Sequence, residues 1–330
     1  MKQEHRKRRV RRVVFMLLIA VTVFAADYFA YPYRSHITAP TRNTGDNGIW
    51  VRHTWADSPH SDAEYAALAS RFAEMQVRRA YIHLRSVDAT GKLKHPPGPN
   101  TLKLTAALKK LAPNVQLIAW IYVNGDPAEH NGVNLTDQSA LIGMCKTAAD
   151  ATNNLGFDGV QWDVEPVASG SPEFLDLLRK TKVAIGRSKL LSIATPMWEP
   201  APLRAFSWSE TYFTAVANEC DEMAVMCYDS GFYTPRAYSW LVRQQAIKVT
   251  AAIGKSGSPC KAVFGVPAYA DGLRSHNPRA ENLYFALRAV REGLDDPAAD
   301  RANFAGVAIF ADYTLTPQDV ATYKQLWLGK

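Results

Sequence analysis

From about residue 46, short runs of β-branched and aromatic residues alternate with longer amphipathic stretches. Eight short runs have the length and composition of buried strands: Ile49–Thr54, Arg79–Leu84, Gln116–Val123, Gly159–Glu165, Leu190–Pro196, Glu222–Tyr228, Ala262–Pro267 and Gly306–Ala311. The longer stretches begin at capping residues or carry apolar residues at three- and four-residue spacing, which predicts helices. The clearest are Ser61–Met75, Ser171–Ile185, Pro235–Ile253, Arg279–Gly293 and Pro317–Leu328.

This alternation predicts an α/β fold with one domain. Eight strand–helix units in about 285 residues have the number and length of a (β/α)8 TIM barrel, which we place at residues 48–330. A doubly wound open sheet is the alternative. It would usually carry a glycine-rich turn after its first strand, and residues 53–57 contain no glycine.

The positive charge of the chain is concentrated at its beginning. The formal net charge is +7, but residues 1–12 contain seven basic residues and one acidic residue, which leaves about +1 for the rest. A nearly neutral body excludes a basic phosphate-binding face, so nucleic acid is not an expected partner.

An apolar segment follows the basic one. Val13 to Ala26 is uncharged and is closed by Asp27. A basic region before a short apolar run is the layout of a signal peptide or a signal anchor, which we assign to residues 1–33, with a polar spacer at 34–47. Both alternatives predict an extracytoplasmic body, either periplasmic or at the cell surface, and the anchor would make the membrane a partner.

The four cysteines, Cys145, Cys220, Cys227 and Cys260, have no zinc-site spacing, and no metal is predicted. Cys220 and Cys260 precede the sixth and seventh strands, which should bring them together at the bottom of the barrel. We therefore predict a disulfide between them, with four unpaired thiols as the alternative.

The fourth strand carries the most informative chemistry. Side chains alternate along a strand, so Gln161, Asp163 and Glu165 share one face, which we expect to point into the barrel. Two carboxyl groups so close should not both ionise freely, which would raise the pKa of one and keep a proton available near neutral pH. The alternative is that both carboxylates cap the next helix.

Four segments resemble the strand motifs of glycoside hydrolase family 18, the chitinase-like group. Asp158 to Glu165 is similar to D-G-x-D-x-D-x-E, residues 226–229 to M-x-Y-D, residues 264–269 to G-x-P-x-Y, and residues 306–310 to the eighth strand. Two positions depart from the pattern. Gln161 replaces the first Asp of the D-x-D-x-E core, and Phe310 stands in an eighth strand that usually carries Trp.

The resemblance implies a retaining, substrate-assisted glycosidase that needs neither metal nor cofactor. Glu165 would be the general acid, Asp163 would orient the 2-acetamido group of the substrate, and Tyr228 would hydrogen-bond the acetamido carbonyl. Gln161 would keep a hydrogen bond to Asp163. Aromatic and acidic residues at strand ends suit a sugar site, and we expect substrate contacts from Gln161, Asp229, Trp198, Tyr269, Trp55 and Phe310. We expect a monomer that acts on an N-acetylated oligo- or polysaccharide.

Two other functions stay open. A two-carboxylate barrel glycosidase would need a nucleophile at the seventh strand, where Asp271 is the acid nearest the strand end. A non-catalytic chitinase-like sugar-binding protein is the second, although such relatives usually lose the Glu that this chain keeps as Glu165. Chitin oligomers, peptidoglycan fragments and N-acetylated exopolysaccharides all fit as glycans.

The barrel pattern begins near Ile49, so residues 1–33 should be dispensable for folding. We expect a shortened chain that begins near residue 40 to be soluble and to unfold cooperatively, as followed by circular dichroism during denaturation. Aggregation of the shortened chain, while the full chain behaves well in detergent, would contradict this prediction.

Overall fold

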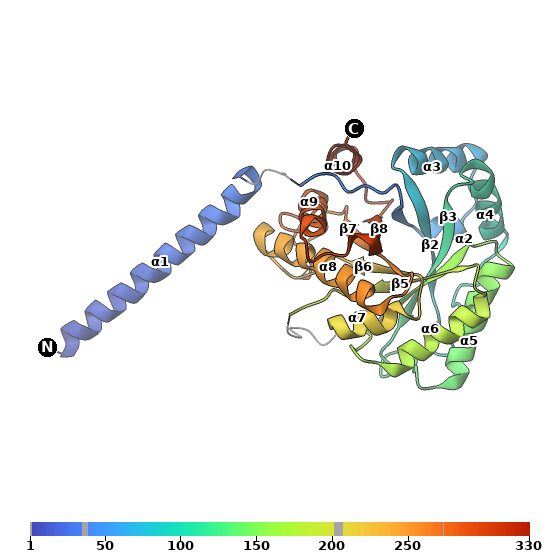
Figure 1. The fold of residues 1–330 in the computed structure, drawn as a ribbon, viewed down its shortest axis with the longest axis horizontal. Coiled ribbons are helices and arrows are strands. Elements are labelled where there is room, and N and C mark those ends of the chain that lie inside the picture. The colour runs from blue at the N-terminus through green and yellow to red at the C-terminus, as the bar shows by residue number, and fades with distance from the viewer. Residues whose placement is uncertain (1, 35–38, 201–206, 273) are drawn as a thin grey trace.

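The computed structural model of the chain describes residues 2–34, 39–200, 207–272 and 274–330. Eight parallel strands pair in sequence order and close into a barrel, because β1 pairs with both β2 and β8 (Figure 1). The predicted fold class is confirmed. The strands are β1 (Asn47–Val51), β2 (Val77–Ser86), β3 (Gln116–Asn124), β4 (Gly159–Glu165), β5 (Leu190–Thr195), β6 (Glu222–Met226), β7 (Lys261–Pro267) and β8 (Phe304–Phe310).

Helices surround the barrel (Figure 1). They are α2 (Thr54–Asp57), α3 (Asp62–Glu74), α4 (Pro99–Leu111), α5 (Gln138–Asn153), α6 (Pro172–Ile185), α7 (Glu210–Ala217), α8 (Pro235–Ser256), α9 (Leu283–Asp295) and α10 (Pro317–Tyr323). A short 3-10 turn, η1 (Arg301–Asn303), precedes β8, and a π-helical turn, η2 (Lys324–Leu328), follows α10.

Several helices begin where side chains satisfy the first free backbone N–H groups. Ser61 and Glu64 form a reciprocal capping box at α3, and Ser171 accepts a hydrogen bond from the backbone of Phe174 at α6. Helix α9 begins later than the predicted residue 279, because Asn282 caps it by accepting from the backbone of Phe285. The expected first strand is also displaced, since it ends at Val51 and the chain enters α2 at Thr54.

The inside of the barrel is partly polar at its base. Glu222 on β6 is buried, forms an ion pair with Arg79 on β2 at 2.7 Å, and accepts hydrogen bonds from Tyr81 and Ser192. A buried ion pair is tolerated when further hydrogen bonds satisfy its remaining polar atoms. These contacts tie strands β2, β5 and β6 together below the site described in the next subsection.

The segment before β1 is more than the polar spacer that we expected at residues 34–47. In its described part, Ala39 is buried, Thr41 donates to the backbone of Trp327, and Arg42 pairs with Asp295. Residues 39–46 therefore pack against the barrel, because their polar side chains find partners on the C-terminal elements.

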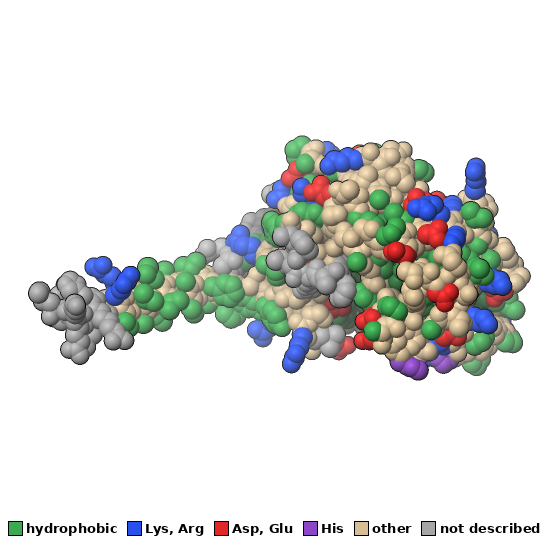
Figure 2. Space-filling model, turned by 90° about the horizontal axis from the view of Figure 1, so that it is seen from below, with side chains coloured by type: hydrophobic (Ala, Val, Ile, Leu, Met, Phe, Trp, Pro, Cys, Tyr) green, Lys and Arg blue, Asp and Glu red, His purple; other side chains and the backbone are tan. Residues whose placement is uncertain are grey.

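Helix α1 (Lys2–Arg34) projects away from the barrel (Figure 1). Its described surface is largely apolar and exposed (Figure 2). Near its end, the ring of Tyr31 lies under the guanidinium groups of Arg236 and Arg288, at 4.7 and 5.2 Å. Among the residues described, no helix meets the length and apolarity required to cross a membrane.

The cysteines lie where the predicted topology places them. Cys220 and Cys260 are neighbours with their Sγ atoms 3.7 Å apart, and both are buried. The structure holds all four cysteines as thiols, so the predicted Cys220–Cys260 disulfide is not formed in it.

The disulfide stays a prediction for the protein under oxidising conditions. The bond would close a loop of 40 residues and stabilise the fold by about 2–4 kcal/mol. Thiols are counted in the denatured, non-reduced protein. We expect two free groups, and four would show that Cys220 and Cys260 remain unpaired.

Candidate active site

Strand β4 presents its polar face to the inside of the barrel. On its other face, Trp162 is fully buried and donates from Nε1 to Thr181 of α6 at 3.0 Å. Because side chains alternate along a strand, Gln161, Asp163 and Glu165 point to the barrel interior. Glu165 ends the strand and is exposed at the mouth, while Asp163 and Gln161 are buried below it.

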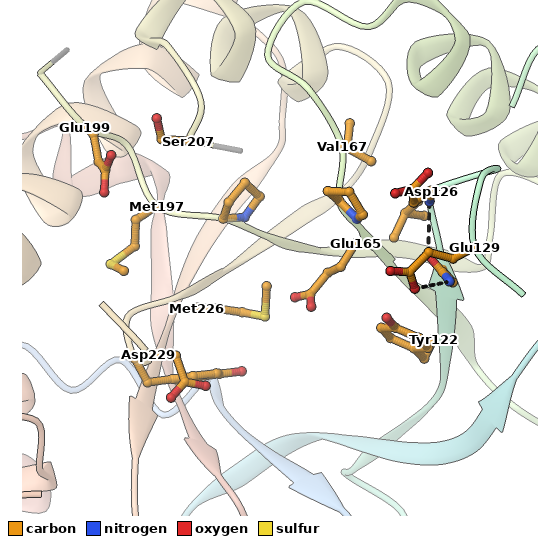
Figure 3. A pocket seen from close by; sticks show the side chains of 15 residues that line it. Tyr122, Asp126, Glu129, Glu165, Val167, Met197, Glu199, Ser207, Met226 and Asp229 are labelled. Atoms are coloured by element: carbon orange, nitrogen blue, oxygen red, sulfur yellow. Dashed lines mark hydrogen bonds between the residues drawn. The ribbon is translucent and has the colours of Figure 1, made fainter. Parts of the chain in front are cut away.

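A cavity of about 550 Å³ opens at the carboxyl ends of β3 to β6. Figure 3 shows Glu165 between Asp126 and Glu129 on one side and Met226 and Asp229 on the other. This is the end of the barrel at which TIM-barrel enzymes place their active sites. The lining residues are Tyr122, Asn124, Asp126, Glu129, Val164, Glu165, Pro166, Val167, Pro196, Met197, Glu199, Ser207, Met226, Tyr228 and Asp229.

Asp163 is a buried carboxyl group with one hydrogen bond. Its Oδ2 accepts from Nε1 of Trp120 on β3 at 2.9 Å, whereas its Oδ1 is buried and has no partner among the described residues. Burial disfavours the charged form and raises the pKa of Asp163, and the bond from Trp120 partly opposes this effect.

The surroundings of Glu165 raise the pKa of its carboxyl group. Its carboxyl group is partly desolvated by the cavity walls, and the negative charges of Asp163 and Asp229 lie nearby. These effects, desolvation first, raise the pKa of Glu165 to about 8. Glu165 therefore holds a proton near neutral pH, as a general acid requires.

Three further predicted residues surround Tyr228, which follows β6 and lines the cavity. The ring of Phe310 stacks on Tyr228 with centroids 4.7 Å apart, and Tyr269 meets Tyr228 edge to face. Tyr269 donates from its hydroxyl to Asp229 at 2.9 Å. Burial raises the pKa of Tyr228 well above its usual value, which keeps its hydroxyl protonated as a donor.

A buried support lies behind Asp229, and no motif in the sequence predicted it. His276 and Glu281 come from the segment between β7 and α9 and are both buried. Nδ1 of His276 lies 3.2 Å from Glu281 and 4.0 Å from Asp229, while Glu281 accepts from the backbone and hydroxyl of Ser230. The potential ligand atoms of Asp229, His276 and Glu281 lie within 4.8 Å of one another. Because Glu281 already interacts with Ser230 and His276, we interpret the group as a hydrogen-bonded support.

The remaining predicted residues lie elsewhere. Gln161 is fully buried below the cavity and bonds Trp50 and Ser192, not Asp163 as we expected. Trp55 stacks on His60, with centroids 4.2 Å apart, beside α3. The ring of Trp198 lies under Lys248 and lines a neighbouring cavity. Neither tryptophan lines the cavity around Glu165.

No family model matches this chain, and no curated protein does. Many solved structures resemble its fold. Over 84% of this chain and 98% of the other, a class V chitinase from Pseudomonas fluorescens superposes with a TM-score of 0.59 and 14% identity. The spore cortex-lytic enzyme SleL of Bacillus cereus matches 86% of this chain and 74% of its own, with a TM-score of 0.56 and 12% identity.

A class V chitinase mutant from the plant Cycas revoluta was solved in complex with (GlcNAc)3. It matches 85% of this chain and 98% of its own, with a TM-score of 0.54 and 15% identity. At such identities the likeness shows the fold alone. The chain is thus similar, in fold, to the barrels of chitinases and a spore cortex-lytic enzyme.

Proposed function

We propose that this protein is an exported glycoside hydrolase that cleaves an N-acetylated glycan by a retaining, substrate-assisted mechanism. The observation that carries the proposal is the pair on β4, with Glu165 at the mouth and, beneath it, a buried Asp163 whose Oδ1 has no partner among the described residues. The raised pKa of Glu165 supports its role as the acid. The fold likeness to chitinases, one of them bound to (GlcNAc)3, supports the substrate class.

In this mechanism the substrate supplies its own nucleophile. The acetamido carbonyl oxygen attacks C1 while the bond from C1 to the glycosidic oxygen breaks, and Glu165 gives its proton to that oxygen. Asp163 accepts a hydrogen bond from the acetamido N–H, and Tyr228 donates to the acetamido oxygen. The resulting Glu165 carboxylate then takes a proton from the water that attacks C1 and opens the oxazolinium ring.

The two-carboxylate alternative finds less support. Asp271, its candidate nucleophile, is exposed and does not line the cavity that contains Glu165.

Export is the second part of the proposal. It is supported by the basic residues at the start of the chain and by the exposed apolar surface of α1, such as Phe15, Leu18 and Phe24.

The first test is Glu165→Gln, assayed on N-acetylglucosamine oligosaccharides. The variant keeps the shape of the side chain but has no proton to transfer, so we expect turnover to fall by about 10²- to 10⁴-fold while oligosaccharide binding persists. Asp271→Asn is the matched control and should retain turnover.

Three outcomes would redirect the interpretation. A wild-type protein that binds N-acetylated oligosaccharides without cleaving them would be a sugar-binding protein. Loss of turnover in Asp271→Asn would favour the two-carboxylate scheme. The same scheme would follow if the wild type cleaved sugars with a free 2-hydroxyl group as fast as their 2-acetamido counterparts.

The raised pKa of Glu165 predicts the pH dependence. A general acid works only while protonated, so kcat/KM should fall as the pH rises through the pKa of Glu165, with a midpoint near pH 8. Asp229→Asn removes one of the charges that raise this pKa, and the midpoint should therefore move to lower pH. Two results would contradict this assignment. One is a fall in kcat/KM whose midpoint lies near the ordinary pKa of Glu, and the other is a midpoint that does not move in Asp229→Asn.

A further inference from the structure

Gln161 belongs to the polar base of the barrel. Its Oε1 accepts from Nε1 of Trp50 at 2.8 Å, and its Nε2 donates to Oγ of Ser192 at 3.0 Å. Ser192 in turn donates to Glu222 at 2.8 Å, the carboxylate that Arg79 neutralises. Both polar atoms of the Gln161 amide therefore have partners below Asp163. It makes no described hydrogen bond to Asp163, although the two residues face the same side of one strand.

Trp120 supplies the hydrogen bond that Gln161 does not. Its indole Nε1 lies 2.9 Å from Oδ2 of Asp163, and this is the hydrogen bond that the structure shows on the carboxylate. Asp163 and Trp120 are both buried, with 6% and 7% of their surfaces exposed. A bond so well shielded from water is strong, and leaving Oδ2 without it would add to the cost of burying the carboxylate.

The indole of Trp120 is held on two sides. The ring of His83 stacks on it with centroids 3.9 Å apart and planes 22° apart, and Phe310 meets it edge to face at 6.2 Å. Rotation of the Trp120 ring would break both contacts. The position of Nε1, and with it the direction of the bond to Asp163, is therefore fixed by packing.

The chemistry of an indole makes this bond one-directional. Nε1–H donates and cannot accept or share a proton at any pH relevant to the protein. Oδ2 therefore already accepts one hydrogen bond, whereas Oδ1 has no partner among the described residues. At Oδ1, a donor that arrives with the substrate would meet no competing donor from the described residues.

We propose that Trp120 is a positioning residue for the reaction: it fixes Asp163 through Oδ2 and so reserves Oδ1 for the N–H of the substrate's 2-acetamido group. The inference rests on the proposed function, and it adds a residue on β3 that none of the strand motifs includes. Trp120 does not touch the substrate in this arrangement. It acts through Asp163.

The test compares Trp120→Phe with Trp50→Phe in the full-length protein. Both changes remove a buried indole N–H that donates to a residue of β4, but only the first concerns Asp163. A hydrogen bond to a carboxylate lowers its pKa, so Trp120→Phe should raise the pKa of Asp163 by about one to two pH units. Trp50→Phe should leave it unchanged.

Two readouts are used. The first is the pH titration of the Asp163 carboxyl carbon by NMR in protein labelled with 13C-aspartate, with Asp163→Asn identifying the signal. The second is the acidic limb of kcat/KM on N-acetylglucosamine oligosaccharides, which should move to higher pH in Trp120→Phe alone. Equal shifts in both variants, or no shift in either, would overturn the role of Trp120.

An isostere guards against a folding defect in Trp120→Phe. Benzothienylalanine at position 120 keeps the two-ring shape and replaces N–H by sulfur, so it should fold and still raise the pKa of Asp163. An unchanged pKa with this isostere would also overturn the inference. The NMR titration does not depend on turnover, so it tests the effect of Trp120 on Asp163 even in a protein without activity. Failure to cleave any N-acetylated glycan would contradict the proposed function alone.

Discussion

A carboxylate inside a closed barrel can be satisfied only by groups on neighbouring strands, and this constraint organises the candidate site. Asp163 points into the barrel because its neighbour Trp162 points outward and bonds Thr181 of α6. There it is buried, and among the described residues its carboxyl group accepts one hydrogen bond, from Trp120. The high pKa of Glu165 follows in part from the same placement, because the charge of Asp163 lies beneath it at the mouth.

The same constraint explains why an amide is well suited to position 161. The base of the barrel already holds the Glu222 carboxylate, which Arg79 neutralises. A carboxylate at position 161 would place a second negative charge on Ser192, one hydrogen bond away from Glu222, and this buried charge would need a partner of its own. Gln161 instead accepts from Trp50 and donates to Ser192, so both of its polar atoms are satisfied without charge.

The sequence predicted what depends on periodicity and left undetermined what depends on contacts between distant segments. Alternation along the chain predicts the eight strands and shows which side chains of β4 point into the barrel. Because parallel strand ends meet at one edge, it also predicts that Glu165, Tyr228 and Asp229 lie near one another. Side chains alternate in direction only within a strand. Trp55 and Trp198 lie beyond β1 and β5, and both pack outside the cavity around Glu165. His276 and Glu281 contact Asp229 and Ser230 from a distant segment, and the Trp120–Asp163 bond also joins residues far apart in the chain. No local pattern encodes these contacts.

Desolvation, neighbouring charge and hydrogen-bond donors together decide which carboxyl group of the site carries the proton. Asp163 receives the indole N–H of Trp120, and Asp229 receives the hydroxyl of Tyr269. The carboxyl group of Glu165 accepts no hydrogen bond within the described part of the chain, and the charges of Asp163 and Asp229 act on it. A donor favours the ionised form of a carboxyl group, and neighbouring negative charge favours the neutral form, so the proton belongs on Glu165. Desolvation at the cavity contributes most to the raised pKa of Glu165, and the charges of Asp163 and Asp229 add to it.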